Sequence, residues 1–333
     1  MENIELHPSR RSDLTQSEAD ILRILNKALT SLVNPAAASA TLARSLREHI
    51  SLQGSQSSQI TSATLLELWE ILLEVVCIVP IDHPLHEVLI AAVDDLRREG
   101  GAVAGSDVGN TPHQTSDSTT SLKWEDQPRL SMYLFDNGQV SKLKATSLFS
   151  ARNSNIKEDP TDLDDHSSED IEAWKRFNSF ASRLISHDFQ SWIVLAYWEI
   201  AGGLKTVPQN TTGFECKIWV ATEWLIQCGT ILFKDLSSTE ELDARELASI
   251  KSGPLCQDIS PHSVQRWDFW QSRLVELTNN KSSNGTALED FSLSASSLSR
   301  LEQAINATHR SRDRVETEGQ ASRDEDSSET VGN

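Results

Sequence analysis

The 333-residue sequence has few basic residues and no cluster of them. Lysine and arginine total 30 against 49 aspartates and glutamates, which gives a formal net charge of −19. Non-specific binding to nucleic acid needs grouped cations that displace counterions from phosphate, and an anionic membrane surface repels a chain of this charge. We therefore expect no nucleic-acid partner and no membrane partner.

Long apolar runs and an export signal are missing as well. The most apolar stretch, 71–81, is interrupted by Glu74 and Pro80 and is shorter than a membrane span. The first residues, MENIELHPSRR, contain acids and lack the apolar core of a secretory signal. We expect an intracellular, cytoplasmic protein.

Cysteine is scarce, and its spacing indicates no metal or disulfide framework. The four cysteines, Cys77, Cys216, Cys228 and Cys256, show neither zinc-ligand spacing nor a Cys-x-x-Cys pair. The first three stand in apolar helical contexts, where a free thiol behaves as a small hydrophobe. We expect all four to be reduced.

Motifs for catalysis and cofactor binding are also missing. Gly202-Gly203 has neither the glycine spacing nor the Lys-Ser/Thr of a phosphate loop, and no Gly-x-Ser-x-Gly elbow occurs. His83 and His86 have no indicated third ligand, and the acidic run 162–166 lacks the glycine of a calcium loop. We therefore expect no metal and no cofactor, and the sequence leans away from an enzyme.

Helical periodicity, by contrast, covers most of the chain. Apolar residues recur at spacings of three and four in nearly every ordered stretch. These stretches are 15–32, 35–50, 61–79, 84–99, 168–186, 188–203, 213–234, 260–278 and 286–309. We expect an all-α fold, an irregular array of about nine antiparallel helices.

Stretches of low apolar content lie between and around these helices. They are a leader at 1–13, linkers at 101–123 and 137–167, and an acidic tail at 311–333. Such composition is typical of solvated disorder. We expect disorder in all four, with one helical domain over 14–310.

The short segment 124–136 between the two linkers allows two interpretations. Its YLF-DNG-QVSKL pattern has the form of a β-hairpin that runs on into the second linker. Pro128 and the isolation of the segment favour irregular or helical packing instead.

Residues 260–278, SPHSVQRWDFWQSRLVELT, give the clearest helix signal. Ser260 is a good N-cap, Pro261 suits the first helical position, and an apolar stripe with two tryptophans follows. Arg266 and Arg273 flank the stripe. We expect their stems to lie on apolar surface with the charges in water, and the alternative for Arg273 is a buried pairing with a carboxylate.

The motifs of the second half resemble a known family. They are Trp-Lys-x-Phe…Phe-x-x-Arg-Leu at 174–184, a Trp-rich helix at 192–199, Trp-x-x-x-x-Gly at 224–229, Gly-Pro-Leu at 253–255 and Ser-x-x-x-x-x-Arg-Trp-x-Phe-Trp-x-x-Arg-Leu at 260–274. Trp69, Val79-Pro80, Asp82, His86, Trp124 and Pro128 match in the first half.

Together these motifs resemble the uncharacterised filamentous-fungal proteins catalogued as domain of unknown function 3632, over roughly 60–310. The resemblance implies an all-helical, intracellular fungal protein. It implies no known activity or cofactor.

Two functions remain open. The favoured one is a non-catalytic helical interaction protein, whose Ser-rich acidic linkers are modified or fold on an unknown protein partner. The alternative is a small-molecule binder or enzyme that uses a Trp-lined cleft between the C-terminal helices, with the tryptophans as plain core residues the simpler interpretation. The candidate cleft residues are Trp192, Trp198, Arg183, Trp267, Trp270 and Arg273. The sequence does not indicate an oligomeric state.

Overall fold

The computed structural model describes residues 6, 14–30, 32, 34–54, 58–103, 122–130, 167–187, 192–205, 211–250, 253–279 and 293–329. Across these residues the regular secondary structure is helical, apart from one isolated antiparallel bridge between Ala102 and Lys123. The all-α prediction is therefore confirmed. The chain divides into two compact units, 1–154 with 172–180 and 155–171 with 181–333. Each unit is described by itself, and a single domain over 14–310 stays a prediction.

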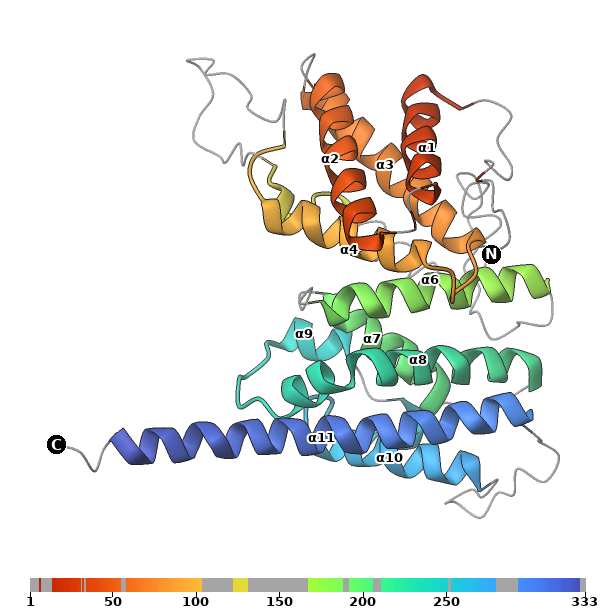
Figure 1. Cartoon of the computed structure of the whole chain (residues 1–333). Helices are drawn as coiled ribbons and strands as arrows, with labels where there is room; N and C mark the ends of the chain where they lie inside the picture. Colours follow the sequence, from red (N-terminus) through yellow and green to blue (C-terminus); the bar gives the residue numbers. More distant parts are fainter. Residues whose placement is uncertain are drawn as a thin grey trace. The chain divides into compact units, whose positions relative to one another are not determined.

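Unit 1 is built on α1 (Gln16–Leu29), α2 (Pro35–Gly54), α3 (Ser58–Ile78), α4 (Leu85–Glu99) and the 3₁₀ turn η1 (Trp124–Asp126). Helix α2 contacts α1, α3 and α4 (Figure 1). Trp69 on α3 is fully buried, and its Nε1 donates to the carbonyl of Pro128 at 2.9 Å. This contact ties the segment after η1 to the centre of the unit.

The middle of α6 (Ser168–Ser186) belongs to the same unit. Arg176 Nη1 donates to the carbonyl of Cys77 at the end of α3, at 2.9 Å. Helix α6 begins with the predicted capping box, in which Ser167 and Asp170 satisfy each other's backbone N–H groups.

Unit 2 contains the end of α6 with α7 (Val194–Leu204), α8 (Thr211–Leu236), α9 (Ala244–Ser249), the 3₁₀ turn η5 (Pro254–Cys256), α10 (Val264–Thr278) and α11 (Ala295–Glu329). Helix α8 contacts α7, α10 and α11, and α10 also contacts α7 and α11 (Figure 1). Because α8 is apolar nearly all round, it suits this interior position.

The close approach of α7 and α8 depends on Gly203. A Cβ at this position would lie 2.6 Å from the backbone oxygen of Lys217 and 2.6 Å from the Cβ of Ala221. Any larger side chain would therefore have to push α8 away. Gly202, one residue earlier, has open space where its Cβ would be.

The start of α10 differs from its prediction. The helix begins at Val264 with Ser263 as N-cap, three residues later than the predicted cap at Ser260. The Ser263 hydroxyl donates to the Ser260 carbonyl at 2.9 Å, and the Arg266 side chain binds the carbonyl of Pro261. These contacts hold 260–263 outside the helix, with bends at 261–263, so the capping prediction is wrong.

The end of α11 also differs, since the helix continues to Glu329 where a disordered tail from 311 was predicted. Ser311 is buried, and Arg312 lies 5.1 Å from the centre of the Phe233 ring and pairs with Asp268 and Glu316. These contacts hold residues 311 and 312 against α8 and α10, beyond the last apolar position of the predicted pattern.

Several predictions lie outside the described residues. These are the disorder of 1–5, 7–13, 104–121 and 137–166, and the hairpin alternative for 131–136. Within the described helices, none is long and apolar enough to cross a membrane.

Candidate functional site

The two tryptophans of α10 form the centre of an aromatic cluster in unit 2. Trp267 and Trp270 are fully buried, with ring centres 6.0 Å apart. Trp267 meets Phe233 of α8 edge-on at 5.2 Å, and Trp270 lies 5.9 Å from Tyr197 of α7. Two of the six predicted cleft residues are thus brought together, and they serve as core.

The other four predicted cleft residues have varied surroundings. Trp198 is half-buried, and its Nε1 donates to the carbonyl of Ser249 at the end of α9, at 2.6 Å. Trp192 is buried and Arg183 is half-buried. Arg273 is buried and pairs with Glu276 at 3.0 Å, which is the alternative that the sequence left open for it. A Trp-lined cleft stays a prediction.

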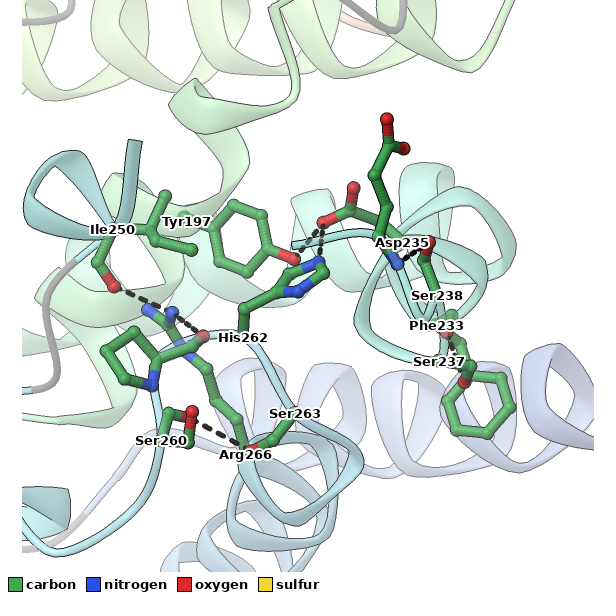
Figure 2. A network of polar contacts seen from close by, with 12 residues as sticks. Tyr197, Phe233, Asp235, Ser237, Ser238, Ile250, Ser260, His262, Ser263 and Arg266 are labelled. Carbon is green, nitrogen blue, oxygen red and sulfur yellow. Dashed lines mark hydrogen bonds and ion pairs between the residues drawn. The ribbon is translucent and has the colours of Figure 1, made fainter. Parts of the chain in front are cut away.

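Arg266 corrects a sequence-based expectation, because its charge is fully buried and not in water. Its Nη1 donates to the carbonyls of Ile250 at 2.7 Å and Pro261 at 2.5 Å (Figure 2). Its guanidinium lies over Tyr197, 4.7 Å from the ring centre, and over Trp270 at 5.3 Å. Burial lowers its pKa to about 10. Nε and Nη2 have no hydrogen-bond partner in the described part of the chain.

Lys205, directly after α7, is a second buried cation. It is fully buried, its Nζ lies 5.8 Å from the centre of the Trp270 ring, and this amine has no hydrogen-bond partner among the described residues. Burial and then repulsion from Arg266 lower the pKa of Lys205 to about 7, against a weaker opposite effect of Cys256.

The segment 253–256 covers the stem of Lys205. A Cβ on Gly253 would lie 2.5 Å from the Cβ of Lys205, so only glycine allows this approach without a shift. This contact gives a physical reason for the glycine of the Gly-Pro-Leu motif.

Asp235, at the end of α8, is the carboxylate of the site. Its Oδ2 accepts a hydrogen bond from the Tyr197 hydroxyl at 2.5 Å and lies 3.5 Å from Nε2 of His262 (Figure 2). Burial, followed by the charge of Asp235, raises the pKa of Tyr197. The Asp235 side chain remains 33% exposed. Its nearest polar partners are therefore Tyr197 and His262, and it makes no ion pair with Lys205 or Arg266 within the described residues.

We name this group the Lys205–Arg266 cluster; it consists of Tyr197, Lys205, Asp235, Cys256, His262, Arg266 and Trp270. Its chemical character is an excess of buried donors and positive charge. Among the described residues no group of three or more His, Cys, Asp or Glu side chains could hold a metal ion. The cluster can bind a ligand that carries hydrogen-bond acceptors and negative charge.

Sequence reasoning missed most of this cluster. Lys205 and Asp235 had no signal, because a charged residue at a helix end is usually solvated. His262 and Arg266 stand in the stretch 260–274 that carries the family resemblance, and Gly253, which lies against Lys205, stands in the Gly-Pro-Leu motif.

Fold and site define a helical protein whose second unit buries two cations among aromatic rings. The family described as "Protein of unknown function (DUF3632)" matches residues 69–274, which include the whole cluster. The chain belongs to this family. No curated protein and no solved structure matches the chain.

Proposed function

We propose that the protein acts by binding, without catalysis, and that the Lys205–Arg266 cluster of unit 2 is its site for a small molecule. One observation carries the proposal. Lys205 and Arg266 are fully buried, and three of their nitrogens have no hydrogen-bond partner among the described residues. This favours the small-molecule alternative of the sequence over a protein-binding role alone.

The free energy of burying these groups supports the proposal. A buried donor without a partner opposes folding by about 1–3 kcal/mol, and by more when it is charged. Strongly shifted pKa values from burial and a neighbouring charge are concentrated at functional sites. A ligand that accepts hydrogen bonds would remove this penalty.

Native mass spectrometry of the full chain, purified from its own cells without denaturation, tests the proposal. We expect an added mass on the parent protein and none on Lys205→Met. Lys234→Met, which changes an exposed lysine of the same unit, should keep the added mass. An added mass that Lys205→Met keeps would show that the ligand lies elsewhere. A parent that carries no added mass under these conditions would count against a resident ligand.

A second candidate function, the non-catalytic interaction protein, is favoured by α11. Beyond Arg312 this helix continues to Glu329, and residues 313–321 are exposed except for a half-buried Val315. Residues 313–329 contain seven acidic residues and two arginines. The exposed stretch 313–321 carries three acidic residues against one arginine, and such a surface suits a protein partner with a basic surface. An intracellular, cytoplasmic location and a fungal source are part of this proposal.

Co-purification at two salt concentrations tests the second candidate. We expect proteins that accompany the full chain at low salt to be lost at high salt, and to be lost from a chain that ends at Arg312. Identical companions for the two chains, or none for either, would contradict a role for α11.

A further inference from the structure

We infer that the Lys205–Arg266 cluster binds a small oxyanion, a carboxylate or phosphate group, held by Lys205 Nζ and by Nε and Nη2 of Arg266. This inference rests on the proposed binding function and names its ligand class. It concerns α7, η5 and α10, and it is independent of the acidic end of α11.

Basic side chains outnumber carboxylates in the cluster. Lys205 Nζ and the Arg266 guanidinium lie 5.8 and 5.3 Å from the centre of the same ring, that of Trp270. The one carboxylate of the cluster, Asp235, has Tyr197 and His262 as its partners and is partly exposed. When Lys205 is protonated, two positive charges therefore repel each other inside the protein with incomplete neutralisation. A small anion would supply the missing negative charge.

The cluster also contains buried hydrogen-bond donors that no described residue pairs with. The unpartnered groups, an amine and two guanidinium nitrogens, are donors when they carry their charge. They match a ligand that offers oxygen acceptors, and charge-assisted bonds to carboxylate or phosphate are about twice as strong as neutral ones. A cationic ligand would add to the repulsion, and a neutral amide would leave the charge in place.

Aromatic rings stabilise the two buried cations in the ligand-free protein. Arg266 lies over two aromatic faces, those of Tyr197 and Trp270, and Lys205 faces Trp270. The negative faces of these rings stabilise the cations in part.

In addition, Ser263 caps α10 without a side-chain hydrogen bond, and no acidic residue stands in the first turn of this helix. The positive end of the helix dipole thus remains unneutralised by side chains there.

Binding of an anion by the cluster should depend on pH. An anion binds the protonated amine of Lys205, whose pKa in the free protein is lowered to about 7 by burial and by Arg266. Above this pH the amine is neutral before binding, so binding takes up a proton and weakens as the pH rises. Affinity should fall about tenfold between pH 6 and pH 8. Tyr197, Asp235, the Cys256 thiol, His262 and Arg266 are the other titratable groups of the cluster.

The test is a binding titration of the full chain with acetate, inorganic phosphate and acetamide, followed by calorimetry and by the thermal midpoint. Acetate gives the cleaner pH profile, because phosphate itself titrates near neutrality. We expect acetate or phosphate to bind and acetamide not to bind. We expect at least tenfold weaker binding to Lys205→Met, unchanged binding to Lys234→Met, and the tenfold loss for acetate between pH 6 and pH 8. A second variant, Lys205→Gln, and far-UV circular dichroism control for folding.

The outcomes separate the two proposals. Anion binding that Lys205→Met and Lys205→Gln leave intact would overturn the inference, as would an affinity for acetate that does not change with pH. Binding of acetamide alone, abolished by Lys205→Met, would overturn the oxyanion class and keep the small-molecule function. If none of the three probes binds and the parent protein shows no added mass in native mass spectrometry, both the oxyanion inference and the small-molecule function are refuted.

Discussion

Replacement of Lys205 by methionine should make the protein more stable at neutral pH. The lysine is fully buried, and its amine has no hydrogen-bond partner among the described residues. Methionine has a similar length and no charge, and buried charges replaced by apolar side chains of similar volume are often neutral or stabilising. The change should therefore remove a penalty without opening a cavity.

The size of the effect follows from the pKa of Lys205. In the unfolded chain this amine has its ordinary pKa of 10.5, and burial and Arg266 lower it to about 7 in the folded protein. Between these two values the unfolded state binds one more proton, so the free energy of unfolding of the parent rises with pH. The penalty is complete, at about 5 kcal/mol, below about pH 6, is about 4 kcal/mol at pH 7, and falls to about 2 kcal/mol at pH 9.

The assay is urea unfolding of the full chain at pH 7 and pH 9, followed by far-UV circular dichroism, in a buffer without phosphate or carboxylates. The free energy of unfolding of Lys205→Met should exceed that of the parent by about 4 kcal/mol at pH 7 and by about half as much at pH 9. Lys234→Met changes an exposed lysine of α8, and its free energy of unfolding should equal that of the parent at both pH values. A less stable Lys205→Met, or a difference that is the same at the two pH values, would refute the reasoning.

Three further predictions concern side-chain packing inside each unit. Trp267→Ala should lower the free energy of unfolding by about 3–5 kcal/mol, since the ring is fully buried and meets Phe233 edge-on; urea unfolding that loses less than about 1 kcal/mol would show that the site collapses around the change. Gly203→Ala should destabilise by about 1–3 kcal/mol because its Cβ would clash with α8, whereas Gly202→Ala, in open space, should be neutral or stabilising in the same assay. The four cysteines are buried, and burial raises the pKa of Cys77 to about 12; a thiol reagent at pH 8 should therefore modify the folded chain far more slowly than the unfolded chain, and rapid labelling of the native protein would contradict this.

The helical class could be read from the sequence because it depends on local patterns. Apolar spacing of three and four identified α1, α2, α3 and α4 of unit 1 and the interior position of α8. The capping box at Ser167 was readable for the same reason, since its partners lie three residues apart. The start of α10 was misplaced because the side chains that hold 260–263 outside the helix include Arg266, whose direction depends on tertiary packing.

The candidate site, by contrast, was decided only in the tertiary structure. The sequence identified Trp267 and Trp270 as a pair because they share one helix face. It placed the charge of Arg266 in water, and it gave no reason to notice Lys205, which follows a different helix. Burial and neighbouring charges belong to the assembled unit, so no local pattern encodes them. The sequence by itself thus determined the helices and their apolar faces, and the packing of those faces determined which charges were left inside.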